Sequence, residues 1–269
     1  MAYGSQCPLA RTKVTMRPDQ IAVQLYTLRE LTAQDLPGTL RAVSAAGYRS
    51  VELAGLPPIQ AEGLRDLLAA ADLQPIASHE PLETLRAGLD GVLDRLAVLD
   101  CPRAIVPWLP EAERATTDDI RGLALELNQI AEACSTRGIR LGYHNHAFEF
   151  ADLGGTTAWA VLLDELSPDV DLELDVYWAT YGGRDAVELI RGLDDRLRLL
   201  HMKDISSMPN GGDVTPGDGV LPWADIVAAG TDRGVEWYVV EEDNPKDAIA
   251  EITRGRSYLE GLGIAEARR

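Results

Sequence analysis

The sequence lacks the long apolar runs, paired cysteines and basic charge that would assign it to several common classes of protein. No stretch reaches about 18 uninterrupted apolar residues, so no membrane span is expected. The net charge of -18 argues against a nucleic-acid binder and against docking on anionic lipid, because both partners require a basic face. Cys7, Cys101 and Cys134 are too few and too widely spaced for a disulfide framework or a CxxC metal site. This cysteine usage fits a reducing cytoplasm.

The N-terminal segment also lacks a feature, namely the apolar core of a secretory signal. Its first fifteen residues read MAYGSQCPLARTKVT. We expect residues 1–16 to form a frayed or disordered extension, with Met16 as the natural start of the chain. Residues 17–269 are then expected to form one catalytic domain, since no linker rich in Pro, Gly or Ser divides them.

Short apolar runs alternate with amphipathic stretches along the whole chain. The apolar runs predict strands at Ile21–Leu28, Ser50–Ala54, Pro75–His79, Arg103–Trp108, Arg140–His144, Asp171–Val176, Leu197–Lys203 and Trp237–Glu241. The amphipathic stretches predict helices at Pro37–Ala46, Ile59–Ala71, Leu82–Leu99, Thr117–Arg137, Thr156–Glu165, Asp185–Gly192, Trp223–Arg233 and Pro245–Leu262.

This alternation favours a barrel. Strand cores such as Ala104-Ile105-Val106 are apolar at consecutive positions, which is typical of parallel strands covered by crossover helices. Eight such units in about 250 residues predict an α/β fold, a single (β/α)₈ TIM barrel. An open doubly wound sheet is the alternative. It often carries a glycine-rich loop after its first strand, whereas here Tyr26-Thr27-Leu28-Arg29 follows.

Histidines and carboxylates gather where the predicted strands end. All four histidines lie at such positions, namely His79, His144, His146 and His201. Acidic residues end three other strands, at Glu52, Asp175 and Glu241. The carboxyl ends of barrel strands meet at one mouth, so these side chains are expected to converge. Imidazole and carboxylate groups together suit a divalent metal and proton transfer.

Asp175, His201 and Glu241 are the strongest candidates for metal ligands, because they occupy equivalent places on neighbouring strands. Strand ends lie about 5 Å apart, so three such groups can reach one ion at roughly 2.0–2.2 Å. Two other readings stay open. Asp175 could cap the following helix, and His201 could be a core histidine bonded to a carbonyl.

Further residues of the predicted mouth are candidates for substrate binding. Lys203 follows His201 by two positions and therefore points the same way, where it could hold a hydroxyl, carbonyl or phosphate. Glu52 and His79 could bind polyol hydroxyls. Trp108 could face the carbon side of a sugar, together with Tyr177 and Trp178. Alternatively, Lys203 is an exposed loop lysine, Glu52 and His79 cap loops, and the three aromatic residues pack in the core.

At these segments the sequence resembles the sugar phosphate isomerase/epimerase family, the xylose-isomerase-like barrels. The resemblance extends from about Ile21 to Leu262. It is carried by the runs YHNHAFEF, LELDVYW, His201-Met202-Lys203-Asp204 and Val239-Val240-Glu241, with Gln24-Leu25-Tyr26-Thr27 and Gly217-Asp218-Gly219. The order and spacing of these motifs are specific for the superfamily but not for one substrate.

The resemblance implies a TIM barrel with one divalent metal ion, Mn²⁺, Zn²⁺ or Co²⁺. Family ligands come from strands five to eight, typically Glu, Asp, His and Glu, and Asp175, His201 and Glu241 match the last three. The strand-five glutamate aligns with His144, so we expect Glu149 to curl back as fourth ligand, with His144 as the alternative. His144 and His146 would then be acid/base groups, and Glu149 and Glu241 would act as ligand or base.

The resemblance further implies a cytoplasmic sugar isomerase or epimerase of carbohydrate metabolism, which moves a proton next to a carbonyl through an enediolate. A lyase that dehydrates a keto-inositol or a 3-keto-glycoside by the same enolate chemistry is the main alternative. An abasic-site endonuclease or a non-catalytic sugar-binding barrel is more distant. The expected partner is a small sugar or sugar derivative. Related barrels are often dimers or tetramers, which leaves a homo-oligomer open.

Overall fold

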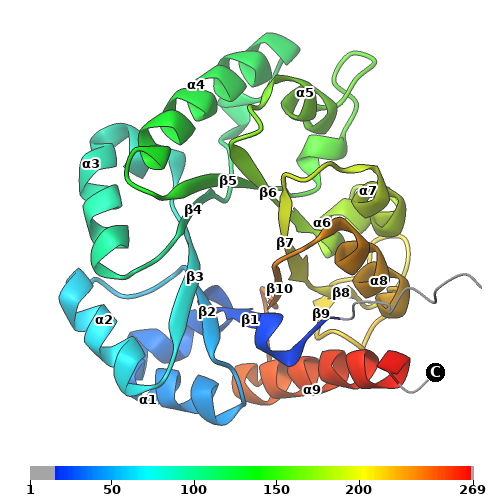
Figure 1. Ribbon diagram of the computed structural model, residues 1–269. Helices are drawn as coiled ribbons and strands as arrows, with labels where there is room; N and C mark the ends of the chain where they lie inside the picture. The colour runs from blue at the N-terminus through cyan, green and yellow to red at the C-terminus, as the bar shows by residue number, and fades with distance from the viewer. Residues whose placement is uncertain (1–15, 268–269) are drawn as a thin grey trace, which may run out of the picture.

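The computed structural model describes residues 16–267 and shows a ring of strands surrounded by helices (Figure 1). The expected N-terminal extension lies outside the described residues, apart from Met16. The side chain of Met16 is 3% exposed and joins the hydrophobic core.

Eight parallel strands close into a barrel in the order β1-β10-β7-β6-β5-β4-β3-β2, which confirms the predicted (β/α)₈ fold. They are β1 (Ile21–Gln24), β2 (Ser50–Leu53), β3 (Gln74–His79), β4 (Arg103–Val106), β5 (Arg140–His144), β6 (Val170–Asp175), β7 (Leu197–Met202) and β10 (Trp237–Val240). A small antiparallel hairpin, β8 (Asp204–Ile205) and β9 (Asp213–Val214), follows β7.

The helices wrap the outside of the barrel (Figure 1). They are α1 (Arg29–Ala45), α2 (Ala61–Ala70), α3 (Leu82–Val98), α4 (Thr117–Ser135), α5 (Ala158–Glu165), α6 (Val176–Tyr181), α7 (Ala186–Gly192), α8 (Trp223–Arg233) and α9 (Ala248–Ala267). Single turns of 3₁₀ helix are η1 (Pro18–Gln20), η2 (Leu25–Leu28), η3 (Glu111–Glu113) and η4 (Phe148–Phe150). Within the described part of the chain, no helix is long and apolar enough to cross a membrane.

Two expected boundaries at the start of the barrel were wrong. The strand predicted to extend to Leu28 ends at Gln24, because the Gln24 side chain accepts a hydrogen bond from the Tyr26 amide and starts a 3₁₀ turn. The helix predicted from Pro37 begins at Arg29. It tolerates this proline because the backbone leaves helical geometry at Asp35 (φ -149°, ψ 83°) just before it.

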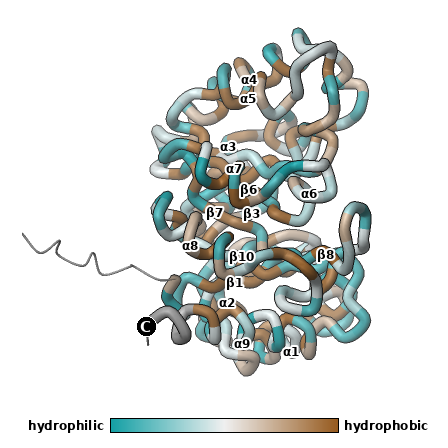
Figure 2. Tube along the Cα trace, turned by 90° about the vertical axis from the view of Figure 1, so that its right-hand side faces the viewer, coloured by the Kyte–Doolittle hydropathy of each residue, from teal (hydrophilic) through white to brown (hydrophobic). Residues whose placement is uncertain are grey.

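The core has two layers, and the inner one determines where polar chemistry is possible. The larger layer lies between strands and helices, and Figure 2 shows hydrophobic residues along both. A smaller cluster fills the inside of the barrel, formed by Ala22, Ile76, Ala77, Ile105, Leu199 and Val239. It supplies an apolar floor, and the polar residues of the barrel interior lie at the strand ends above it.

A group of ion pairs closes the opposite, amino-terminal face of the barrel. Asp171 on β6 is 1% exposed and accepts hydrogen bonds from Arg103 Nε at 3.1 Å and from Arg140 Nη2 at 2.6 Å. Arg103 also pairs with Glu236. These contacts join β4, β5 and β6 to the segment before β10, far from the mouth, so their role is stability.

Replacing Asp171 with Asn is expected to lower the free energy of unfolding by about 3 kcal/mol, because it removes the buried carboxylate that Arg103 and Arg140 share. Urea unfolding of both proteins measures the change. The matched control is Asp169→Asn, because Asp169 lies 3.7 Å from Arg140 but its side chain is 70% exposed. Its change should stay within about 0.5 kcal/mol. Equal effects of the two substitutions would contradict a structural role for Asp171.

Candidate active site

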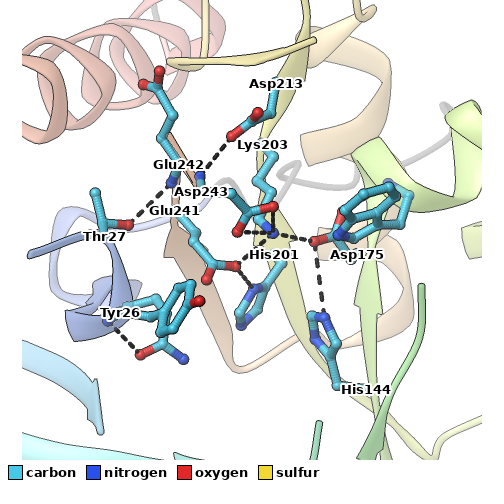
Figure 3. Close-up of polar contacts among 12 residues, drawn as sticks. Tyr26, Thr27, His144, Asp175, His201, Lys203, Asp213, Glu241, Glu242 and Asp243 are labelled. Carbon is cyan, nitrogen blue, oxygen red and sulfur yellow. Dashed lines mark hydrogen bonds and ion pairs between the residues drawn. The ribbon is translucent and has the colours of Figure 1, made fainter. Parts of the chain in front are cut away.

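The register of the barrel places the polar strand ends side by side. Asp175 is paired with His201 across β6 and β7, and His201 is paired with Val239 on β10, two residues before Glu241. His144 on β5 is paired with Glu173 on β6. These side chains therefore converge at one mouth, as Figure 3 shows for His144, Asp175, His201 and Glu241.

Asp175, His201 and Glu241 form one cluster of donor atoms, called here the outer group. One donor atom from each residue lies within 4.8 Å of those of the other two. His201 Nδ1 lies 2.7 Å from Glu241 Oε2, and the two side chains are fully or almost fully buried. The structure thus brings together the three residues that the sequence proposed as ligands of one ion.

Asp175 shows directly that the outer group suits a cation. Its Oδ1 accepts a hydrogen bond from the Trp178 amide at 2.9 Å and so caps α6. Its Oδ2 is buried and has no hydrogen-bond partner among the described residues. Lys203 Nζ lies 3.3 Å from that atom. One nitrogen and two carboxylates are donors that Zn²⁺, Mn²⁺ and Co²⁺ accept, so the residues fit one divalent ion.

Lys203 is a buried cation of the mouth. Its side chain is 2% exposed, and its Nζ lies 2.9 Å from Glu241 Oε2 and 3.0 Å from Asp243 Oδ1 (Figure 3). Burial alone would lower the pKa of this ammonium, but Glu241, Asp175 and Asp243 raise it well above its usual value. Lys203 therefore stays charged, and the alternative of a solvent-exposed loop lysine is wrong.

A second cluster lies beside the outer group, inside the barrel. It consists of His79, His144, Glu173 and His201, whose donor atoms also lie within 4.8 Å of one another. We call it the inner group. His201 belongs to both groups, because its Nδ1 faces Glu241 and its Nε2 lies 3.2 Å from Glu173 Oε2.

Glu52 borders the inner group. Its Oε2 lies 2.7 Å from His201 Nε2 and accepts a hydrogen bond from Gln24 at 2.9 Å. Glu52 is 0% exposed, and burial raises its pKa to about 7. The structure thus places Glu52 beneath the cavity, bonded to histidine, whereas the sequence proposed it as a contact for sugar hydroxyls.

Glu173 was not among the residues singled out from the sequence. It is fully buried, and its Oε2 contacts three imidazoles, those of His79, His144 and His201. The sequence did contain a signal for Glu173, because residues two apart on a strand point to the same side. The alternation that places Lys203 on the same side of its strand as His201 also places Glu173 on the same side as Asp175.

The structure does not bring Glu149 to the outer group. Both of its oxygens are already bonded, because Oε1 accepts from the Tyr143 hydroxyl at 2.7 Å and Oε2 accepts from the His146 amide at 2.8 Å. Burial raises the pKa of this carboxyl to about 8. Glu149 therefore supports the loop after β5 in this structure, and His144 Nε2, from the end of β5, lies 4.0 Å from Asp175 Oδ2.

A cavity of about 550 Å³ opens above these groups. Its wall includes His79, His144, His146, Trp108, Lys203 and Glu241. Trp108 is 48% exposed, which fits an aromatic surface for a ligand rather than core packing. Trp178 lies behind His146, with ring centroids 5.3 Å apart, and Tyr177 lies against Trp178.

The histidines of the cavity differ in protonation. Burial lowers the pKa of His144 to about 3 and that of His146 to about 2, so both rings are neutral at pH 7. Burial also acts on His201, but Glu173, Glu241 and Glu52 outweigh it and raise its pKa well above the usual value. The mouth thus holds two imidazoles that are unprotonated at pH 7, and that are weak bases because burial disfavours their charged form, close to the charged Lys203.

Residues 40–262 match the family described as the xylose isomerase-like TIM barrel. The chain belongs to this family. The match and the fold confirm the resemblance that the sequence motifs indicated.

Known relatives differ in activity. The chain is 26% identical over 207 residues to an inosose dehydratase of Geobacillus kaustophilus, a match that spans 64% of each protein. A sugar phosphate isomerase/epimerase structure from Parabacteroides distasonis is 25% identical, with a TM-score of 0.79, over 93% of this chain and 97% of that one. The IOLI protein, solved with a bound zinc atom, has a TM-score of 0.71 at 14% identity and covers 92% of this chain and 97% of its own.

The raised pKa of Glu149 predicts a pH dependence of stability. Its carboxyl is protonated in both states below about pH 4.5. Above this pH the unfolded chain loses the proton, whereas the folded protein keeps it up to a pH of about 8. This group therefore lowers the free energy of unfolding by at most about 1.4 kcal/mol per pH unit across that window.

Glu149→Gln removes this contribution, so the stability of the variant relative to the unsubstituted protein should rise with pH between about 5 and 8. Urea unfolding at several pH values measures this. Metal content should stay unchanged, because both Glu149 oxygens are bonded to Tyr143 and His146. Parallel stability profiles, or loss of metal, would show that the carboxylate has a different role.

Proposed function

We propose that this protein is a divalent-metal-dependent dehydratase of a cyclic keto polyol of the inosose type. It would remove the proton next to the carbonyl and expel a neighbouring hydroxyl. The observation that carries the proposal is the placement of neutral His144 and His146 and of charged Lys203 around one cavity, directly beside the outer group.

Asp175, His201 and Glu241 would hold the metal ion, which when bound supplies positive charge to polarise a substrate carbonyl. The bound zinc atom in the structurally similar IOLI protein supports a metal in this type of barrel.

The residues of the chain supply the proton transfers. His146 lies at the cavity wall and its Nδ1 has no hydrogen-bond partner among the described residues, so this nitrogen can accept the proton from the carbon next to the carbonyl. Burial makes it a weak base, and it therefore holds the proton only briefly. Phe148 stacks on its ring with a centroid distance of 6.0 Å and helps to fix its orientation. Protonated His146 then gives this proton to the departing hydroxyl, which leaves as water, while Lys203 keeps its own protons and orients that hydroxyl with a hydrogen bond.

The charges of the cavity favour a substrate without phosphate. Arg29 and Lys203 are the cations in its wall. Arg29 donates to the carbonyl oxygens of Tyr26 and Asp243, at 3.0 and 2.8 Å. Lys203 is surrounded by three carboxylates. A phosphate would therefore find no free cation among these residues, whereas hydroxyl groups would find many acceptors.

Two observations favour elimination over isomerisation. The likeness to the Geobacillus inosose dehydratase supports it, although the match spans 64% of that protein. In addition, His144 occupies the place where the family commonly has a glutamate, so imidazoles rather than a pair of carboxylates lie beside the substrate. Isomerisation or epimerisation of a ketose is the second candidate, supported by the likeness to the Parabacteroides structure.

The mass of the product separates the two candidates. Purified protein loaded with Mn²⁺, Zn²⁺ or Co²⁺ is incubated with inososes, 3-keto-glucosides and simple ketoses. The proposal predicts a product lighter by one water from an inosose. A product of unchanged mass would favour isomerisation, and turnover of none of the three substrate classes would contradict the proposal.

His146→Asn should reduce this turnover by at least about 100-fold, because it removes the proton acceptor. Tyr181→Phe is the matched control. Tyr181 lies next to Trp178 with ring centroids 5.6 Å apart, but it does not belong to the cavity wall. Full activity of the His146 variant would exclude His146 as the base.

A further inference from the structure

The proposed reaction uses the outer group and the cavity wall, and it leaves much of the inner group without a role. Three imidazoles and a carboxylate from four different strands meet there, below the mouth. Buried charged side chains are costly, and a cluster of this kind inside a barrel requires a counter-charge or a ligand.

The geometry of the inner group is close to that of a four-coordinate metal site. Glu173 Oε2 lies 2.9 Å from His79 Nε2, 3.0 Å from His144 Nδ1 and 3.2 Å from His201 Nε2. In a tetrahedral zinc site, bonds of about 2.0–2.1 Å place neighbouring donors roughly 3.3 Å apart. The three separations from Glu173 Oε2 are close to that spacing, and the donor atoms of all four residues lie within 4.8 Å of one another.

Two buried carboxylate oxygens without hydrogen-bond partners also favour a cation at the inner group. Glu173 Oε1 and Glu52 Oε1 are buried without a hydrogen-bond partner in the part of the chain that the structure describes. Both side chains are 0% exposed. Two carboxylates with one free oxygen each, packed against three imidazoles, are better compensated by a divalent ion than by hydrogen bonds alone.

We propose that the inner group is a second metal site, in which His79 Nε2, His144 Nδ1, Glu173 and His201 Nε2 bind a zinc ion. His201 would link the two sites as an imidazolate, because its Nδ1 faces the outer group and its Nε2 the inner one, and binding of both ions would release its ring proton to solvent. Three nitrogens and one carboxylate oxygen favour Zn²⁺ over Mg²⁺ or Ca²⁺.

The surroundings of the inner group are those of a metal site. Glu52 Oε2 contacts two of the proposed ligands, at 2.7 Å from His201 Nε2 and 3.4 Å from His79 Nε2. Gln24 donates to the same oxygen at 2.9 Å and fixes it. Because these are the nitrogens that would bind the ion, Glu52 would lie at the ion as a further carboxylate rather than behind the imidazoles. His79 and His144 also line the cavity, which gives an ion a path from solvent.

Zinc stoichiometry tests the proposal. The full chain is stripped with a chelator, reloaded with Zn²⁺, dialysed and measured by native mass spectrometry and elemental analysis. About two zinc ions per chain are expected, falling to about one in His79→Asn and in Glu173→Gln, because each loses one of four inner ligands. Asp175→Asn should lose the other ion. His146→Asn is the matched control and should keep both, because His146 belongs to neither group.

One zinc ion in the unsubstituted protein, or two that persist in both the His79 and Glu173 variants, would overturn the second site. Anomalous diffraction from zinc-loaded crystals of the unsubstituted chain gives an answer that does not depend on how the variants fold. It should show a peak between His79 and Glu173 as well as one at Asp175, and a single peak at Asp175 would overturn the proposal. Because metal content is read rather than turnover, this result leaves the proposed dehydration standing.

Discussion

The burial of carboxylates around His201 is the constraint on which the rest of the site depends. His201 contacts Glu241 through one ring nitrogen and Glu52 and Glu173 through the other, and all four side chains are at most 5% exposed. Like charges so close together in an apolar barrel repel one another and lose their hydration. The protein compensates with imidazole and with Lys203, and the same arrangement favours a divalent cation.

The barrel makes this concentration of charge tolerable. The apolar floor formed around Ile76, Ile105, Leu199 and Val239 packs the interior below the mouth, and the ion pairs of Asp171 close the far face. Stability is thus supplied mainly by layers that take no part in the chemistry. The strand ends are free to carry residues that cost stability and that the proposed metal binding and proton transfer require.

Much of this arrangement could be predicted from the sequence, because it follows from local pattern and barrel symmetry. The strand at Arg140–His144 and the helix at Trp223–Arg233 have the predicted bounds. Closure of the barrel was sufficient to predict that Asp175, His201 and Glu241 meet at one mouth. The helix α6 was missed because it follows β6 without a breaking residue, and Asp175 caps it while also facing the mouth.

Tertiary contacts determined what the pattern could not. The orientation of Glu149 depends on the Tyr143 hydroxyl and on the turn η4, and a spacing of five residues after His144 does not encode either contact. The burial of Glu52 likewise depends on Gln24, at the end of β1, and on His201, on β7. These two strands lie on opposite sides of the position where the barrel closes. The sequence thus predicts which strand ends converge at the mouth, but it does not predict how deeply each side chain is buried there.

The central claim is that the outer group holds a metal ion that enables proton removal next to a carbonyl. Deuterium exchange at that carbon of an inosose, followed by NMR in D₂O, tests it most directly. The metal-loaded protein should incorporate deuterium, while the chelator-stripped protein and the metal-treated His201→Ala variant should not. Equal exchange by the loaded and stripped proteins would contradict the account.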